Sequence, residues 1–237
     1  MHLKKLPKYI YNFFLFLLRN PYILYVFILL RFFFLKRIYG IKQLESSKNI
    51  QGSNAHNLEA YNHIEIDILM KRFDRMLFSV LAIERVGADS NILIIGNRTE
   101  SDIFKLNSYG FKRITAVDLI TYSPKVTLMD AHSMSFQDNS FDIVLLPYVL
   151  PYTNYPRLLS SEVIRVTKNN GIVSIAIDYN KTKDIKSVED IKNLFSGCIH
   201  NINFIYNHEL SNFDNDTLFQ KIGSKASAIN LTFSLKK

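Results

Sequence analysis

The alternation of short apolar runs with helix-like segments over residues 91–235 constrains the fold more than any other feature of this sequence. The run Asn91–Gly96 has four consecutive aliphatic residues and ends in glycine, which is typical of a strand buried on both faces of a parallel sheet. Further strands are expected at 113–118, 141–146, 172–178, 202–206 and 229–235, and helices at 99–109, 157–167 and 188–195. Because strands joined by helices form right-handed crossovers, the pattern predicts an α/β domain with a parallel sheet covered on both faces.

The basic charge of the chain is concentrated at its N-terminal end. The whole chain of 237 residues has a formal net charge of +8. The first 42 residues contain eight basic side chains and no acidic one, which accounts for all of this charge. The remainder therefore contains 21 basic and 21 acidic side chains. Since a groove that binds nucleic acid leaves a surplus of Lys and Arg, we expect no nucleic-acid partner. The single cysteine, Cys198, excludes a disulfide within one chain.

The same N-terminal segment is strongly apolar. Between Tyr9 and Tyr39, 24 of 31 residues are apolar and half of these are aromatic. Arg19, Asn20 and Pro21 interrupt the run, and Arg31 interrupts it again, so no piece reaches the ~20 residues that a spanning helix needs. Asparagine is a good N-cap and proline suits the first helical turn, so a second helix should begin at Asn20-Pro21.

These features predict two membrane-associated helices that lie at the cytoplasmic face of a membrane, with rings toward lipid and cations toward anionic head groups. A single membrane span and an oligomerisation hairpin buried against a partner are the alternatives. Residues 43–57 are polar and are expected to form a linker, and Leu58–Val86 has the spacing of an amphipathic helix packed on the following domain. The expected division is 1–42 for the membrane helices, 43–57 for the linker and 58–237 for the α/β domain.

Two residues at predicted strand ends indicate a ligand site. Gly96 closes the first strand, and Asp118 closes the second, 22 residues later. In dinucleotide-binding folds, a glycine turn lets the backbone approach the ligand, and an acid about 20 residues on accepts hydrogen bonds from ribose. One glycine and one acid do not distinguish a nicotinamide enzyme from other nucleotide-binding proteins.

The next segments carry a more specific pattern. It consists of Asp130-Ala131, Met134-Ser135-Phe136, the run DNSFDIV at 138–144 and the run RVTKNNG at 165–171. In order and spacing this series resembles the class I S-adenosylmethionine-dependent methyltransferases, in the branch that acts on small molecules and lipids. The resemblance covers residues 91–178. It implies a Rossmann-like, doubly wound, seven-stranded sheet, and S-adenosyl-L-methionine as the cofactor.

The resemblance also implies roles for particular residues. Gly96 and the following turn would face the methionine part of the cofactor. Asp118 would accept hydrogen bonds from the ribose hydroxyls, with Leu119 against adenine, and Asp130 would accept from the adenine amino group, with Ala131 beside the ring. Pro147 and Tyr148 would complete the pocket near the acceptor. Alternatively, Asp118 and Asp130 only cap the turns that follow them, and Tyr148 belongs to the core.

The glycine turn departs from the family pattern. The family has an acid two positions before the first of three alternating glycines, whereas this chain has Ile94 at the acid and Arg98 and Glu100 at the second and third glycines. Two explanations compete. Arg98 and Glu100 rebuild the turn by pairing with the carboxylate and ammonium of the cofactor's methionine, or the pocket is degenerate and no longer binds cofactor.

The leading hypothesis is therefore a membrane-associated methyltransferase acting on an unidentified small-molecule, lipid or lipid-linked acceptor. The alternative is a catalytically inactive scaffold of the same fold. No general base is assigned, although His132, Tyr148 and Tyr152 are candidates by position. The histidines show no metal-ligand spacing, so no metal is expected. Glu162 and Arg165 are expected on an exposed helix face.

Overall fold

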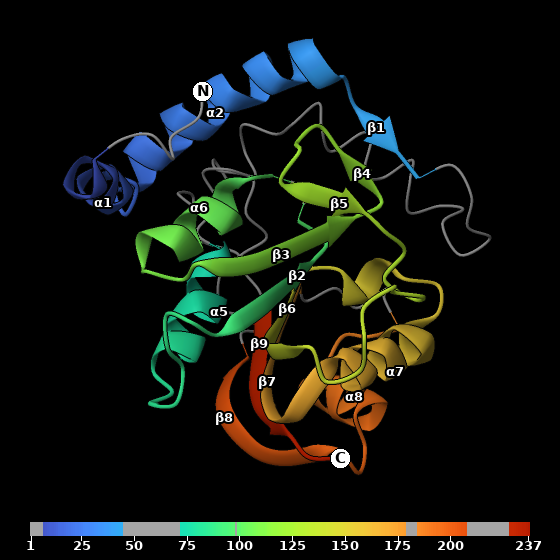
Figure 1. Ribbon diagram of the computed structural model, residues 1–237. Helices are drawn as coiled ribbons and strands as arrows, with labels where there is room; N and C mark the ends of the chain where they lie inside the picture. Colours follow the sequence, from blue (N-terminus) through green and yellow to red (C-terminus); the bar gives the residue numbers. More distant parts are fainter. Residues whose placement is uncertain (1–6, 45–71, 98, 179–183, 208–227) are drawn as a thin grey trace, which may run out of the picture.

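The computed structural model describes residues 7–44, 72–97, 99–178, 184–207 and 228–237 (Figure 1). Arg98, most of the predicted linker at 43–57 and the first half of the predicted helix at 58–86 lie outside these residues.

A seven-stranded sheet forms the centre of the described fold, with the strand order β5-β3-β2-β6-β7-β9-β8. The strands are β2 (Asn91–Ile95), β3 (Arg113–Asp118), β5 (Val126–Leu128), β6 (Phe141–Pro147), β7 (Thr167–Asp178), β8 (Ile199–Asn207) and β9 (Ala228–Leu235). Strand β9 runs antiparallel to both of its neighbours, β7 and β8, whereas the other strand pairs of this sheet are parallel. The predicted mostly parallel, seven-stranded sheet is confirmed. The sequence did not locate β5, because three residues are too few to show a pattern.

Helices cover both faces of the sheet, as Figure 1 shows for α5 and α6 on one side and α7 and α8 on the other. These helices are α5 (Arg72–Leu81), α6 (Ser101–Ser108), α7 (Pro156–Val166) and α8 (Val188–Leu194). In β2, Ile92 and Ile94 belong to the buried cluster with α5 and α6, whereas Leu93 and Ile95 belong to the cluster with α7 and α8. Since side chains alternate along a strand, an all-aliphatic strand supplies both cores at once.

The helix boundaries follow the prediction within a few residues. Helix α5 ends at Leu81, earlier than the predicted end at Val86. Strand β7 begins at Thr167, five residues before the predicted strand at 172–178. Within it, Asn170 has a φ of 60°, a backbone conformation more typical of a turn.

Two helices precede the domain, α1 (Lys8–Leu17) and α2 (Pro21–Tyr39). The predicted N-cap is confirmed, because the side-chain oxygen of Asn20 accepts from the backbone N of Tyr22 at 2.9 Å and of Ile23 at 3.3 Å. Within the described residues, no helix alone has the length and hydropathy to cross a bilayer. Taken together, α1 and α2 meet that criterion, but they are bent by 107° at their junction.

One side of α2 is packed against the α/β domain. Its buried residues Leu24, Ile28 and Phe32 form a cluster with Phe104 of α6 and with residues at strand β4 (Ile120–Thr121). The short strand β1 (Lys42–Gln43) then pairs antiparallel with β4. The N-terminal helices are therefore held on the domain by a hydrophobic cluster and a strand pair, and α2 follows the outside of α6 (Figure 1).

The two arginines that interrupt the apolar run contact opposite ends of α6. Arg19 Nε donates to the Ser108 carbonyl at 3.0 Å, and its guanidinium lies 4.9 Å from the centre of the Tyr109 ring. Arg31 forms an ion pair with Glu100, the N-cap residue of α6. These charges therefore attach the N-terminal segment to the domain.

Candidate functional site

Most of the predicted cofactor residues meet at one edge of the sheet. Gly96, Asp118 and Pro147 lie at the carboxyl ends of the adjacent strands β2, β3 and β6, and Asp130 follows β5 closely. All four are partly exposed. The strand order reverses between β2 and β6, which is where α/β sheets form a ligand crevice. The structure thus brings together residues that lie up to 51 positions apart in the sequence.

Gly96 occupies a position that only glycine tolerates. Its φ is +81°, and a Cβ there would lie 2.0 Å from Cγ2 of Val149. Its backbone N donates to the Val117 carbonyl at 2.9 Å, which fixes the turn on β3. The close approach of Val149 and the left-handed backbone together explain why the first glycine of the family pattern is retained.

Asn97 lies in the turn that the family resemblance predicts to face the cofactor, but no role of its own was predicted for its side chain. Its side chain is 1% exposed, and within the described part of the chain neither its amide nitrogen nor its amide oxygen has a hydrogen-bond partner. A buried amide without partners costs about 1–3 kcal/mol. An unsatisfied amide at the turn after β2 is therefore ready to bind a polar ligand group. The only sequence signal was its position directly after Gly96.

Asp118 caps the turn that follows it. Its Oδ1 accepts from the backbone N of Leu119 at 2.6 Å and of Ile120 at 3.3 Å. Leu119 packs against the cluster formed by α2 and β4. The capping interpretation of Asp118 is confirmed, and a carboxylate held in this way also has a fixed orientation at the edge of the sheet. Contact with ribose, and contact of Leu119 with adenine, stay predictions.

Asp130 joins a chain of polar contacts through His132 to Thr153. Its Oδ1 accepts from the backbone N of His132 at 2.9 Å and contacts Nδ1 of the same residue at 2.6 Å. The other ring nitrogen, Nε2, contacts the Thr153 hydroxyl. Ala131 packs against the core beneath this loop. The chain connects the loop after β5 to the segment after β6, so it orders both sides of the predicted pocket. The Asp-x-His spacing was the available sequence signal.

The segment after β6 begins with a strained residue. Tyr148 directly follows Pro147 and has a φ of +59°, which is rare for a bulky side chain. Its backbone N donates to the Ala176 carbonyl at 2.9 Å, and its side chain packs on the core under α5. Such strain costs about 1–3 kcal/mol and is often found at functional sites. A 3-10 helix, Leu150–Tyr152, continues from it.

Glu100 is placed differently from the expectation. It is fully buried, and both carboxylate oxygens accept from Arg31, at 2.5 and 2.9 Å, while Ser123 Oγ donates to Oε1 at 2.5 Å. Its negative charge is therefore balanced by α2, and the expected pairing of Glu100 with the cofactor's ammonium group is not supported. The sequence could not reveal this because the partner lies 69 residues away. The role of Arg98 stays a prediction.

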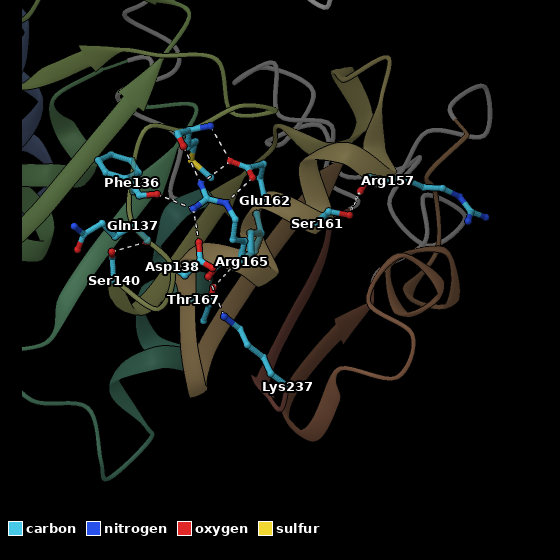
Figure 2. A network of polar contacts seen from close by, with 12 residues as sticks. Phe136, Gln137, Asp138, Ser140, Arg157, Ser161, Glu162, Arg165, Thr167 and Lys237 are labelled. Atoms are coloured by element: carbon cyan, nitrogen blue, oxygen red, sulfur yellow. Dashed lines mark hydrogen bonds and ion pairs between the residues drawn. The ribbon is translucent and has the colours of Figure 1, made fainter.

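The expectation of an exposed Glu162 and Arg165 is wrong. Figure 2 shows Arg165 of α7 directed into the loop before β6, where it donates to the carbonyls of Met134 and Phe136 at 2.8 and 2.7 Å. It also pairs with Asp138 and Glu162, and Glu162 accepts from Met134 N. The hydrogen bond from Arg165 lowers the pKa of Glu162. The family motif at 134–138 is therefore held by α7.

Comparisons with known proteins agree with this architecture. Residues 95–175 match the family model described as "Methyltransferase domain". The N-methyltransferase NodS from Bradyrhizobium japonicum, solved with S-adenosylhomocysteine, is 15% identical with a TM-score of 0.54; the match covers 71% of this chain and 88% of NodS. A chain of the complex that contains the Haloferax volcanii Trm112 methyltransferase activator is 13% identical with a TM-score of 0.59; that match covers 81% of this chain and all of the other.

A third solved structure is the Haemonchus contortus phosphoethanolamine N-methyltransferase 2, in complex with phosphomonomethylethanolamine and S-adenosylhomocysteine. It is 16% identical with a TM-score of 0.51, and the match covers 69% of this chain and 53% of that protein. No similar sequence was found among curated proteins. At these identities the structural matches show the fold.

The matched stretch and the sheet show which class of protein this chain resembles. Residues 95–175 match a methyltransferase domain, and the seven-stranded sheet has the fold of the class I S-adenosylmethionine-dependent methyltransferases. S-adenosylmethionine is the cofactor of that class. The residues present fit it: among the described residues the buried amide of Asn97 has no partner, and Asp118 and Asp130 place carboxylates at the same edge of the sheet. In the described part of the chain, no group of three or more His, Cys, Asp or Glu is placed to hold a metal ion.

Proposed function

We propose that this chain transfers a methyl group from S-adenosylmethionine to a lipid or lipid-linked acceptor at the cytoplasmic face of a membrane. The observation that carries the membrane part is the outer apolar face, defined as the exposed large apolar side chains of α1 and α2. These are Tyr9, Ile10, Phe13, Phe16, Tyr22, Ile23, Val26, Leu30, Phe33, Phe34, Ile38 and Tyr39.

The outer apolar face lies on helices whose other side is already packed. Because Leu24, Ile28 and Phe32 satisfy the contact with the domain, the apolar residues opposite them have no role in that core. Many large apolar side chains exposed on one pair of helices usually mark a binding surface for a partner or a lipid bilayer. Its size and aromatic content suit a helix pair lying in the interfacial region.

Charge favours a membrane as the occupant. The first 42 residues contain no acidic side chain, and Lys8, Lys36, Arg37 and Lys42 are exposed beside the apolar residues. Anionic lipids of the cytoplasmic leaflet attract such cations by about 1 kcal/mol for each side chain near the surface.

In the proposed reaction, the sulfonium of S-adenosylmethionine supplies a methyl group that is already activated. The chain's own residues bind and align. Asn97 and Asp118 would bind polar groups of the cofactor, and Asp130 would bind its adenine. The segment that begins at Pro147 and contains the strained Tyr148 would contact the acceptor. The solved relative with phosphomonomethylethanolamine supports a lipid head group or its precursor as one acceptor class.

Vesicle sedimentation of the full chain tests membrane binding. We expect binding to vesicles of phosphatidylcholine with phosphatidylglycerol, and weaker binding to phosphatidylcholine alone. Replacing Phe33 and Phe34 by serine should reduce binding at least tenfold, since both are more than half exposed. The matched control is Leu158→Ser, an exposed position on α7. A full chain that stays in the supernatant with both vesicles would overturn the membrane proposal.

Calorimetric titration of the full chain with S-adenosylhomocysteine tests cofactor binding. We expect saturable binding, and a loss of about 1–3 kcal/mol of affinity for Asp118→Ala, because hydrogen bonds to a charged acceptor are lost. The catalytically inactive scaffold is the second candidate, favoured by the missing glycines and by the burial of Glu100 against Arg31. Absence of binding by the wild-type chain would decide for the scaffold.

A further inference from the structure

The N-terminal helix α2 contacts the end of the turn that follows β2, through Arg31 and Glu100. Glu100, at the end of this turn, is fully buried and is the N-cap residue of α6. Its carboxylate accepts from Arg31 Nε at 2.5 Å and Arg31 Nη2 at 2.9 Å. Two parallel hydrogen bonds of this type fix orientation as well as distance.

Other groups complete the environment of the ion pair. Ser123 donates to the same carboxylate, and the backbone N of Glu100 donates to the Tyr122 hydroxyl at 3.3 Å. The Arg31 guanidinium lies over the rings of Phe27 and Phe104, at 5.7 and 5.1 Å from their centres. Burial and the charge of Glu100 raise the pKa of Tyr122, so its hydroxyl stays protonated. The Glu100 carboxylate is therefore fully buried and hydrogen-bonded, and the Arg31 guanidinium packs against two aromatic rings.

The pair lies close in sequence to the unsatisfied part of the site. Glu100 is three residues after Asn97, whose buried amide has no partner among the residues that the structure describes, and four after Gly96. Asn97 N is also within hydrogen-bond distance of the Val117 carbonyl, at 3.4 Å. The turn is thus attached at its start to β3 and at its end to α2. The two later glycines of the family pattern, which would allow positive φ and close approach of the backbone, are absent here, and Gly96, Asn97 and Glu100 are each held by hydrogen bonds to other elements.

We infer that Arg31 is a positioning residue for the cofactor site, and that α2 is consequently part of that site as well as of the outer apolar face. Arg31 acts through Glu100, by holding the end of the turn so that Gly96 and Asn97 present their backbone and amide to the cofactor. This inference rests on the proposed binding of S-adenosylmethionine at the turn.

Titration of the full chain with S-adenosylhomocysteine tests the inference, at a temperature where every variant is folded by circular dichroism. Arg31→Gln should raise the dissociation constant at least tenfold, because the buried Glu100 loses its partner and draws the turn away. Arg31→Lys keeps the charge but loses the paired geometry, and should raise it by a smaller factor. If Arg31→Gln does not fold, the Arg31→Lys variant alone tests the inference.

Arg19→Gln is the matched control. Arg19 belongs to the same N-terminal segment and contacts the far end of α6, at Ser108 and Tyr109. A general loss of helix packing would affect both arginine variants, whereas positioning of the turn should leave the Arg19→Gln dissociation constant within twofold of wild type.

The outcomes separate the inference from the proposed function. If the wild-type chain binds and both Arg31 variants bind equally well, the inference is overturned and the proposed function stands. Equal weakening by Arg19→Gln and Arg31→Gln also overturns it. A wild-type chain that binds no S-adenosylhomocysteine overturns both.

Discussion

At the scale of single residues, the site depends on positions where backbone conformation and burial are both unusual. Gly96 and Tyr148 have positive φ, and the side chain of Asn97 is buried with no hydrogen-bond partner among the described residues. These three residues follow β2 and β6, the two strands between which the order of the sheet reverses. Such strain and unsatisfied polarity reduce stability, so their concentration at one edge supports a binding role for that edge.

Replacement of Gly96 by alanine should destabilise the chain by about 2–4 kcal/mol, because positive φ and overpacking both carry a cost. Chemical denaturation measures the loss. Gly110→Ala is the control, since Gly110 has a φ of +99° with open space around its Cβ position, and it should show only the smaller backbone cost. Adding Val149→Ala to the Gly96 variant should recover part of the loss. Equal losses in the two single variants would show that the Val149 contact is not important.

At the scale of elements, α7 holds the loop before β6 through a single arginine. Arg165 connects Met134, Phe136, Asp138 and Glu162 (Figure 2). A nearby carboxylate, Asp142, lies near the start of β6 and joins it to the neighbouring strands: it accepts from Asn91 N at 2.8 Å and from Lys168 at 2.7 Å. At these positions, the residues of the family-like motif therefore attach the loop and the start of β6 to the rest of the domain.

Glu162→Gln should cost about 1–2 kcal/mol of stability at pH 7, through loss of charge-assisted hydrogen bonds. Because the folded state lowers the pKa of Glu162, its stabilisation is fully present above the unfolded pKa of about 4.3. It is lost as pH falls through the lower folded pKa, so the difference between variant and wild type should disappear there. Denaturation midpoints between pH 7 and acid measure this.

Glu189→Gln is a suitable comparison, since Glu189 is exposed and pairs only with Lys192 among the contacts described. Its effect should stay within about 0.5 kcal/mol at every pH. A Glu162→Gln difference that does not change with pH would mean that the stabilisation comes from packing.

At the scale of the whole molecule, the N-terminal helices connect an apolar surface to the catalytic domain. One side of α2 is core, and the other carries the outer apolar face. The two arginines of the segment attach it to both ends of α6. A binding event on the outer apolar face would therefore occur on the same helix that pairs with Glu100, at the end of the turn after β2.

A truncated chain that begins at residue 45 should be less stable than the full chain by at least about 3–5 kcal/mol. It would expose Phe104, Ile120 and Tyr122, and it would leave the charge of Glu100 without Arg31. Urea denaturation and binding of a hydrophobic dye measure the effect. The full chain with Phe33→Ser and Phe34→Ser is the control, because those residues are exposed. A truncated chain as stable as wild type would show that the packing of α2 contributes little.

The sequence alone determined most of the helices and strands and the resemblance to the methyltransferases. Four aliphatic residues ending in Gly96, the alternation that follows, and the spacing of Asp118 and Asp130 predicted the sheet and the edge where these residues meet, because both depend on local periodicity. The N-cap at Asn20 was likewise local. Only the tertiary structure decided the partners of the charges. Arg31 and Glu100 are 69 residues apart, and nothing in their local patterns indicates that burial would pair them. Long-range packing of α2 on α6 brought them together and assigned Glu100 to the support of the turn.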